Sequence, residues 1–559
     1  MNRLIRLTFL MSSIALMIPG IASASTAGSC SAFASGSCPA SIPSGVNSFY
    51  FIDYVGGNDT NSGTTEAAPW QHAPGMANAT GNAASHTPTA GEGWIFKGGV
   101  TVDYHAYPMN VPWGGAAGQP DYMGYDPAWY AGSSWARPIF NGGGSGGYNA
   151  ANQSLLTDIA HHSSYVVIDN LEFTGIYFGS ACSNSGPYTC GAISQYGYQG
   201  SDVSWEIKNV YVHGWSHCSF SGACGDPGNE ASLISAKQDA RSSIHDTVID
   251  GFDSSKDCCN ALASWNEYNN YIAYVDNAEF GEISLFHDNV ITNMVTPSNG
   301  VHGNCIHLFG SSNMTELIYN NYVSCLNTGT PDEMFLIEET GGATVYAFNN
   351  VMVRDGHGSG FEVKNSNTNF FFQNTQECGE DATAGSECVQ LYSGASGAAT
   401  ITEKNSVGIT TNSNQPTVSN LSGFAGTFNA APVSGKTCSG GAQNAFGGTQ
   451  ICSPTSTLNI NEPYPFAPMN STDASTIGTA SGLAPLCTII GGINSAAGAA
   501  CLSDTTLGVA YDSTNHTVSW PNRTPITHST AGPWQNGAYE FGQSAAAPSA
   551  PTGLSAVVN

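Results

Sequence analysis

The pattern of apolar and polar positions in the middle of this chain is a short apolar run that ends in Asn or Asp. The run recurs at residues 166–170, 205–209, 244–246, 283–289, 317–321, 345–350 and 370–374. In most cases a second short apolar run follows at once, as at residues 322–325 and 351–353. The closing Asn recurs at positions 321, 350 and 374 and near 405, so one repeat takes roughly 25–30 residues. A period of this size is typical of solenoids, propellers and other repeat arrays.

The composition of each repeat predicts strands rather than helices. Apolar positions at the helical period are nearly absent, whereas Gly, Asn, Ser and Thr are abundant. Short apolar runs bounded by such turn-forming residues predict strands. Asn tolerates the left-handed backbone that a sharp turn between two strands requires, and stacked Asn turns can bond to one another through their amides as a ladder. The repeat therefore predicts a β-helix, in which every coil buries its apolar face on the neighbouring coils.

Each coil also contains a strand that precedes the Asn strand, and four of these strands align by their alternation. They are residues 306–309, 335–338, 361–364 and 389–392. Their first and third positions are apolar and should point inward, so the second and fourth positions should point outward. The two outward columns are His307, Leu336, Glu362 and Gln390, and Phe309, Glu338, Lys364 and Tyr392. Because neighbouring strands lie about 4.8 Å apart, we expect Glu338, Glu362 and Lys364 side by side on one exterior face.

The rest of the chain divides around these coils. Residues 1–24 have the form of a secretory signal peptide, with two arginines, an apolar stretch too short to span a bilayer and a small-residue cleavage site. We expect a Ser/Gly/Cys-rich leader at residues 25–48 and an N-terminal cap with the first coils at 49–150. The parallel β-helix should follow at 151–410, irregular final coils with a C-terminal cap at 411–543, and a Pro/Ala-rich tail at 544–559. A small β domain is the alternative for the fourth of these segments. The protein is expected to be secreted and to insert into no membrane.

All 16 cysteines lie beyond the predicted signal peptide. An even number of cysteines in an exported chain indicates disulfides. No CxxC pair is present and no His flanks the cysteines at zinc-ligand spacing, so the pattern disfavours a metal site. Pairing by nearness in the sequence predicts seven disulfides, Cys30–Cys38, Cys182–Cys190, Cys218–Cys224, Cys305–Cys325, Cys378–Cys388, Cys438–Cys452 and Cys487–Cys501.

The formal net charge is -28, from 41 acidic and 13 basic residues. Such a surface makes nucleic acid a poor partner. It also repels a free polyanion unless cations or a local basic patch offset the charge. Solubility outside the cell accounts for the acidity by itself, and a requirement for Ca²⁺, which binds carboxylate and carbonyl oxygens, is the alternative.

Residues 50–100 carry a resemblance that is specific for a fold. A first strand is followed by Gly-Asn-Asp-Thr-Asn-Ser-Gly-Thr at residues 57–64, by Pro69-Trp70, and by Ala-Gly-Glu and Phe-Lys-Gly-Gly within residues 90–99. This block resembles the N-terminal cap of secreted right-handed parallel β-helix proteins, the group that includes many polysaccharide lyases. The resemblance implies an all-β, right-handed parallel β-helix with an extracellular polysaccharide as its partner. It implies less about the reaction, because the fold also hosts adhesins.

The predicted outer face is the best candidate for chemistry. A lyase that acts on a uronate polymer needs a base for the proton next to the carboxylate and a cationic group that neutralises this carboxylate. The β-helix lyases that the chain resembles often use Lys or Arg as the base and Ca²⁺ as the neutralising cation. The candidates for catalysis are Lys364, Glu338, Glu362, His307 and Arg354, and those for substrate binding are Phe309, Tyr392 and Gln390.

Residues 360–364, Gly-Phe-Glu-Val-Lys, precede the Asn strand at 369–374 and are similar to a stretch of the family-nine pectate lyases. That family has Gly-Phe-Asp-x-Lys at this place, and a calcium-binding Asp-Asp-Gly-x-Asp after the Asn strand. Here Glu362 replaces the Asp, and residues 387–390 are Glu-Cys-Val-Gln, so most of the calcium carboxylates are absent. The departure puts that calcium site and pectate specificity in doubt.

A second acidic group lies in the loop at residues 250–257. Asp253 and Asp257 are candidate Ca²⁺ ligands there, or the loop binds a sugar, and a solvated turn held by disulfides is the alternative.

The function that these patterns favour is a polysaccharide lyase that cleaves a uronate-containing glycan by β-elimination. A glycoside hydrolase on the same groove is an alternative, because Glu338 and Glu362 loosely meet the spacing that hydrolysis needs. A non-catalytic surface or adhesive protein is another, and the scarcity of Arg favours it, since uronate binders usually need Arg. In that case the charged column is an exterior ladder of salt bridges between coils, worth about 0–1 kcal/mol for each pair.

Overall fold

The structure is a computed structural model of the 559-residue chain. It describes residues 28–111, 114–151, 153–158, 163–179, 190–195, 204–217, 232–236, 242–255, 259–294, 304–310, 313–324, 333–339, 342–353, 359–363, 367–377, 389–391, 400–410, 418–419, 427–432, 449–452, 467, 483–528, 534–535 and 537–540. The predicted signal peptide and the Pro/Ala-rich tail lie outside these residues.

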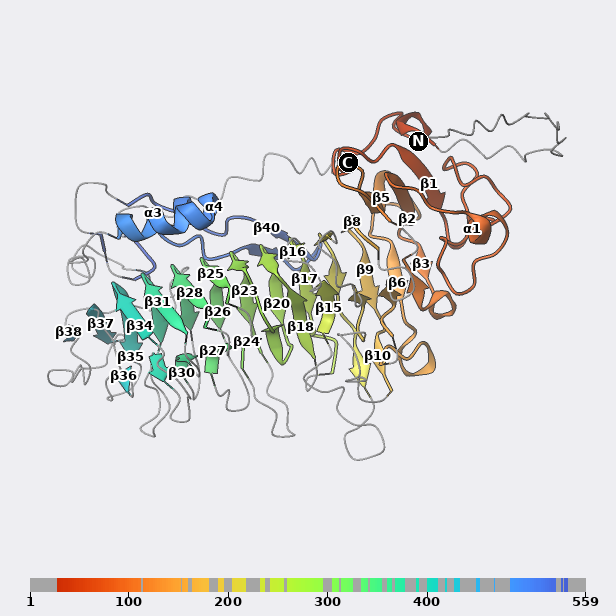
Figure 1. Ribbon diagram of the computed structural model, residues 1–559. Coiled ribbons are helices and arrows are strands. Elements are labelled where there is room, and N and C mark those ends of the chain that lie inside the picture. The colour runs from red at the N-terminus through yellow and green to blue at the C-terminus, as the bar shows by residue number, and fades with distance from the viewer. Residues whose placement is uncertain are drawn as a thin grey trace, which may run out of the picture.

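Three long sheets of parallel strands run side by side along one axis (Figure 1). In each regular coil the chain passes from a strand of the sheet that we call C to one of sheet A and then to one of sheet B, before it returns to sheet C one level further on. The chain is therefore a right-handed parallel β-helix, as the sequence predicts.

Sheet A has 12 strands, which are β1 (Ser48–Ile52), β2 (Glu92–Gly98), β5 (Asp121–Tyr130), β8 (Val166–Asp169), β12 (Trp205–Lys208), β16 (Ser243–His245), β19 (Asn266–Tyr268), β22 (Leu285–His287), β25 (Thr315–Tyr319), β28 (Thr344–Phe348), β31 (Thr368–Phe372) and β34 (Thr400–Lys404). Sheet B has 13 strands, which are β3 (Thr101–Val102), β6 (Ile139–Asn141), β9 (Glu172–Thr174), β13 (Tyr211–Val212), β17 (Val248–Asp250), β20 (Tyr271–Ala273), β23 (Val290–Thr292), β26 (Tyr322–Ser324), β29 (Val351–Val353), β32 (Thr375–Glu377), β35 (Ser406–Thr410), β37 (Thr427–Pro432) and β38 (Thr449–Cys452).

Sheet C has 11 strands, which are β4 (Met109–Asn110), β7 (Leu156–Thr157), β11 (Ile193–Ser194), β15 (Ser232–Ala236), β18 (Asn260–Ser264), β21 (Asn277–Phe280), β24 (Ile306–Gly310), β27 (Glu333–Glu339), β30 (Ser359–Val363), β33 (Val389–Leu391) and β36 (Val418–Ser419). Outside these sheets lie the parallel pair β10 (Tyr177–Phe178) and β14 (Ser216–His217), the antiparallel hairpin β39 (Ala510–Asp512) and β40 (Thr517–Ser519), the helices α1 (Gly81–Ser85), α3 (Ala484–Ile493) and α4 (Ser495–Cys501), and 3-10 turns at Cys30–Ala32, Tyr104–Ala106 and Gly144–Gly146.

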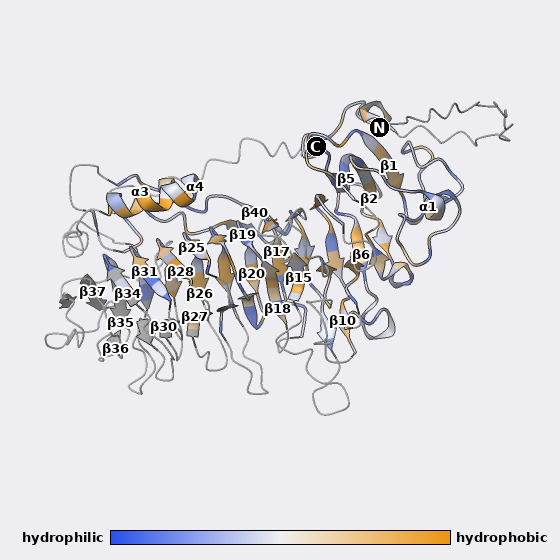
Figure 2. Ribbon diagram, in the orientation of Figure 1, coloured by the Kyte–Doolittle hydropathy of each residue, from blue (hydrophilic) through white to orange (hydrophobic). Residues whose placement is uncertain are grey.

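One apolar core fills the interior between the three sheets. Strands of successive coils pair in register. In sheet A, Ile318 lies opposite Ala347 and Ala347 opposite Phe371, and all three side chains are buried in the core. Figure 2 shows apolar residues distributed along the strands of all three sheets. Each coil alone would expose this apolar face to water. Stacking of the coils buries it, which stabilises the fold by about 25 cal/mol for each Å² of apolar area removed from water.

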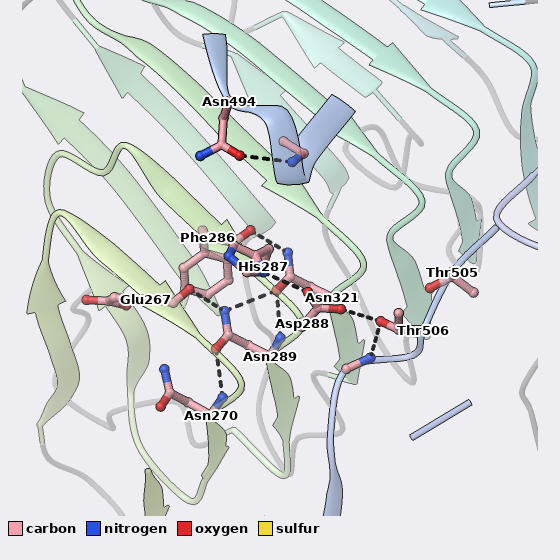
Figure 3. A network of polar contacts seen from close by, with 12 residues as sticks. Glu267, Asn270, Phe286, His287, Asp288, Asn289, Asn321, Asn494, Thr505 and Thr506 are labelled. Atoms are coloured by element: carbon pink, nitrogen blue, oxygen red, sulfur yellow. Dashed lines mark hydrogen bonds and ion pairs between the residues drawn. The ribbon is translucent and has the colours of Figure 1, made fainter. Parts of the chain in front are cut away.

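The turn between sheets A and B uses two adjacent residues for different purposes. The first is left-handed, as at Asn320 and Asn349, whose φ angles are 58° and 57°. The second is a buried Asn whose amide bonds to the next coil. The backbone N–H and side-chain N–H of Asn321 both donate to Oδ1 of Asn350, at 3.1 and 3.0 Å. Asn289 donates to Asn321 in the same way (Figure 3). Asn350 likewise donates to Asn374.

The chain turns back after the coils and packs lengthwise against the solenoid. Helices α3 and α4 lie on sheet A, where Ile490 belongs to the same buried apolar cluster as the stacked rings of Tyr319 and Phe348. Residues 503–528, which we call the C-terminal strap, then run along the solenoid toward its first coils as far as the hairpin β39–β40 and return to the end of α4 (Figure 1). The Thr506 hydroxyl bonds to Asp288 Oδ1 on the way (Figure 3).

Two of the predicted disulfides are formed, Cys30–Cys38 and Cys487–Cys501. Cys190, Cys259 and Cys305 are disulfide-bonded as well. Each of the other predicted pairs includes a residue outside the described ranges, so those pairings stay predictions. Within the described ranges no helix is long and apolar enough to cross a bilayer.

Candidate functional site

The strands that carry the sequence-predicted site pair in the register expected from their alternation. His307 of β24 lies opposite Leu336 of β27, which lies opposite Glu362 of β30. Glu362 in turn lies opposite Gln390 of β33. The second column begins with Phe309 opposite Glu338. Sheet C therefore places these positions on adjacent strands of one face.

Three titratable side chains of this face are described, and two of them touch. His307 Nε2 lies 3.2 Å from Glu338 Oε2. The Glu338 side chain is 41% exposed and that of His307 is 12% exposed. Glu362 lies in the same column as His307, but only 3% of it is exposed. The face thus holds an imidazole paired with a partly exposed carboxylate, and a buried carboxyl group on the next strand.

The other residues proposed for this face are not described. Lys364, Arg354 and Tyr392 lie outside the described residues. Phe309 and Gln390 belong to described strands, but their side chains are not described. Their roles stay predictions.

A cavity of about 600 Å³ lies on a different face, that of sheet B. Strands β9, β13, β17 and β20 and the loop after β17 form its floor, and the hairpin β39–β40 of the strap covers it. Its lining consists of carboxylates, aromatic rings, two histidines and one serine, namely Glu172, Asp250, Asp253, Tyr211, Tyr271, Tyr274, Tyr511, Phe252, His213, His516 and Ser513.

His213, which directly follows β13, bridges two carboxylates at the edge of this cavity. Its Nδ1 lies 2.8 Å from Asp253 Oδ2, and its Nε2 lies 3.2 Å from Glu172 Oε1. Burial lowers the pKa of His213, but the hydrogen bonds to Glu172 and Asp253 outweigh this and raise the pKa above its usual value. Burial raises the pKa of Asp253, and the bond from His213 reverses this and leaves the pKa lowered. The arrangement stabilises an imidazolium between two carboxylates.

The hairpin is fixed over the cavity by stacking and by hydrogen bonds. Tyr511 stacks on Tyr271 with centroids 3.8 Å apart, and its hydroxyl donates to Asp250 Oδ2 at 3.0 Å. His516 stacks on Tyr211 at 4.2 Å, and its Nδ1 lies 2.8 Å from the Tyr511 hydroxyl. Burial lowers the pKa of His516 despite the nearby Asp250. The neutral ring is therefore the favoured form near neutral pH.

A buried guanidinium anchors the tip of the hairpin from the solenoid. Arg137 donates to the carbonyls of Asn515 and His516, both at 3.0 Å, and to that of Asn209 at 3.3 Å. Carbonyl oxygens at a turn tip otherwise face water, so this charged donor holds the tip in one place.

Sequence reasoning singled out one wall of this cavity and missed the rest. The role of Asp253 as a calcium ligand stays a prediction. In the structure Asp253 Oδ2 is bonded to His213, and Oδ1 accepts from the Gly214 N–H and the Ser254 hydroxyl. Asp257 lies outside the described residues. In the described part of the chain no group of three His, Cys, Asp or Glu side chains is placed to hold a metal ion. The cavity joins residues from 172 to 516, and no local motif signals such an assembly.

Comparison with known proteins gives no family. No family model matches the chain, and no curated protein matches it. Similar solved structures include XylC in complex with xylose, at 11% identity and a TM-score of 0.43, over 74% of this chain and 88% of that chain. They also include the GH136 lacto-N-biosidase from Eubacterium ramulus, at 12% identity and a TM-score of 0.38, over 74% of this chain and 67% of that chain. Pectate lyase Pel9A aligns at 14% identity and a TM-score of 0.29, over 88% of this chain and 96% of that chain. At such identities and TM-scores these structures carry no argument about chemistry.

Proposed function

We propose that the protein is exported, binds a uronate-containing polysaccharide on the outer face of sheet C and cleaves it by β-elimination. The observation that supports this proposal best is the placement of His307, Glu338 and Glu362 on neighbouring strands, with the imidazole 3.2 Å from the Glu338 carboxylate. Export is supported by the disulfides Cys30–Cys38 and Cys487–Cys501, since disulfides persist in oxidising compartments.

In the proposed reaction a base removes the sugar proton next to the carboxylate. The released electron pair forms a carbon–carbon double bond, the bond from the neighbouring carbon to the glycosidic oxygen breaks, and that oxygen takes up a proton. Lys364 is the proposed base. The Glu338 carboxylate orients His307, which suits the imidazole to hand a proton to the leaving oxygen or to share the role of base.

The experiment is a panel of uronate polymers mixed with the full chain, followed by the ultraviolet absorbance of the unsaturated product. Turnover should fall by roughly 10²–10⁴-fold in Lys364→Ala and in His307→Ala. Thermal unfolding of each variant checks that the fold is kept. Absence of the absorbance across the whole panel would overturn the proposal.

Calcium is a separate part of the proposal, as the ion that would neutralise the uronate carboxylate. The described residues form no ligand set for it, so we assign no step to a metal. Turnover that falls on chelation and returns with added Ca²⁺ would support this role. Unchanged turnover would leave neutralisation to cationic side chains.

Glycoside hydrolysis on the same face is the second candidate. One observation favours it, the contrast between Glu338, whose side chain is 41% exposed, and Glu362, which is 3% exposed. Hydrolases often use two carboxyl groups whose environments differ, one as acid and one as nucleophile or base. New reducing ends without an unsaturated product, lost in Glu338→Gln and in Glu362→Gln, would select this reaction. Binding without either product would indicate a non-catalytic surface protein.

A further inference from the structure

The walls of the cavity on sheet B are held in place by specific contacts. Its floor belongs to the solenoid and its cover to the strap, and the two are joined by the Tyr271–Tyr511 stack, by the hydrogen bond from Tyr511 to Asp250, and by Arg137. A site whose walls are fixed in advance loses little entropy when a ligand enters. A volume of about 600 Å³ lies in the range of small-molecule sites, roughly 300–1,000 Å³.

The charge of the lining is negative. Three carboxylates face the cavity, from Glu172, Asp250 and Asp253. His213 offsets one of them, and Arg137, counted although it bonds to the hairpin carbonyls, offsets a second. His516 adds no positive charge near neutral pH, because burial lowers its pKa. The cavity thus keeps an excess of negative charge inside a protein whose net charge is -28, which opposes a uronate or any other anion.

Aromatic rings line the cavity beside these carboxylates. Tyr211 and Tyr271 stack on residues of the strap. Phe252 lies at the cavity with 72% of its surface exposed, and its ring meets that of Tyr274 edge to face at 5.8 Å. Ring faces attract cations, and aromatic walls beside carboxylates are the usual surroundings of an organic ammonium group in a protein.

We propose that this cavity binds the protonated amine of an amino sugar. The ammonium group would lie between the carboxylates and the Phe252–Tyr274 corner, and the carboxylate oxygens would also accept hydrogen bonds from the sugar hydroxyls. The site lies on sheet B, and so it is separate from the face of sheet C that we propose for cleavage. It requires no lyase activity, and either proposal can fail without the other.

The test uses matched probes that differ in charge. Titration calorimetry of the full chain at mildly acid pH compares a glucosamine tetrasaccharide with its fully N-acetylated counterpart, in salt that screens the general attraction of an acidic surface. We expect the free amine to bind at least about tenfold more tightly. Choline, as a third probe, separates the two sources of the same chemistry. Comparable binding of choline indicates a simple ammonium ligand, and weaker binding indicates that the sugar ring contributes.

Two variants and a control locate the binding. Phe252→Ala removes an exposed ring and Glu172→Gln removes one charge at constant shape, and each should weaken binding of the amine roughly five- to tenfold. Ile489→Ala is the matched control, because Ile489 is 55% exposed on α3, away from the cavity. Equal binding of the amine and its acetylated counterpart, no binding of either, or full affinity in both cavity variants would overturn the proposal.

Discussion

Tyr511 of the strap and Tyr271 of sheet B stack with their ring centroids 3.8 Å apart. This contact joins the C-terminal hairpin to the middle of a solenoid whose strands otherwise pair with the coils above and below. The Tyr511 hydroxyl adds a bond to Asp250, which lies at the end of the neighbouring strand β17. The stack and the bond together fix the hairpin that forms one wall of the cavity on this part of sheet B.

Substitutions of Tyr511 should open the hairpin in two steps. Tyr511→Phe keeps the stack and loses the bonds of the hydroxyl to Asp250 and to His516, which should cost about 1–3 kcal/mol of hairpin stability. Tyr511→Ala also removes the ring. The lost stacking should lower the stability of the hairpin by about 0.5–1.5 kcal/mol more, and the lost apolar burial should lower it further. Hydrogen exchange of residues 510–519 measures the local opening, which global unfolding can miss. Exchange in Tyr511→Ala that matches the wild type would show that the stack does not hold the hairpin.

The pair of His213 and Asp253 predicts how the free energy of unfolding depends on pH. The pKa of His213 is raised from 6.5, so its contribution is complete below pH 6.5 and is lost as the pH rises through the folded-state pKa. The pKa of Asp253 is lowered from 3.8, so its contribution is present above pH 3.8 and is lost as the pH falls through its folded-state pKa. The pair is therefore strongest between pH 3.8 and 6.5.

Nuclear magnetic resonance of the His213 ring, with denaturant unfolding at several pH values, checks this window. Glu172, Arg137 and His516 also face this region, so Glu172→Gln should move the His213 titration toward lower pH. His213→Gln should flatten the pH dependence of the free energy of unfolding above pH 6.5. A His213 that titrates below 6.5 in the wild type would contradict the argument.

Much of the solenoid could be predicted because its order is local. Alternation alone placed His307, Leu336 and Glu362 opposite one another, and the strands pair in that register. One coil was missed because a single residue breaks this local pattern. Glu267 of β19 is buried in the interior column between Ile244 and Phe286, where the pattern requires an apolar residue. Because a carboxylate occupies that position, the strand does not form an apolar run in the sequence.

The cavity could not be predicted, because its order is not local. Tyr511 and His516 lie in a segment without the repeat, and nothing in their neighbourhood points to Tyr271 or Tyr211. Alternation also gives the side of a sheet on which a residue lies, but not what covers it. Glu362 lies in the predicted outer column and is nevertheless 3% exposed.

The buried amide of Asn321 should contribute far more to stability than the neighbouring Asn320. Asn321→Ala removes the Oδ1 acceptor of two N–H groups of Asn289 and the Nδ2 group that donates to the Phe286 carbonyl and to Asn350 Oδ1. Because these partners stay buried, we expect a loss of about 2–4 kcal/mol in the free energy of unfolding, measured by denaturant titration. Asn320→Gly is the control, since glycine adopts the φ of 58° freely and the amide bonds are kept. Similar losses in both variants would refute a special role for the amide.

The disulfide Cys487–Cys501 should hold the strap as well as the helices. It joins α3 to α4 across 14 residues, and the chain continues from Cys501 directly into the strap, where Asn349 Nδ2 donates to the Ser503 carbonyl at 2.7 Å. Replacing both cysteines by Ala should cost about 3 kcal/mol for a loop of this length. Hydrogen exchange should then rise in α3, α4 and the strap and stay unchanged in the interior strands of sheet A. The matched control replaces Cys30 and Cys38, whose disulfide closes a loop at the other end of the chain and should leave exchange of the strap unchanged. If removal of either disulfide loosened the strap equally, the effect would be global, and the link from α4 to the strap would be wrong.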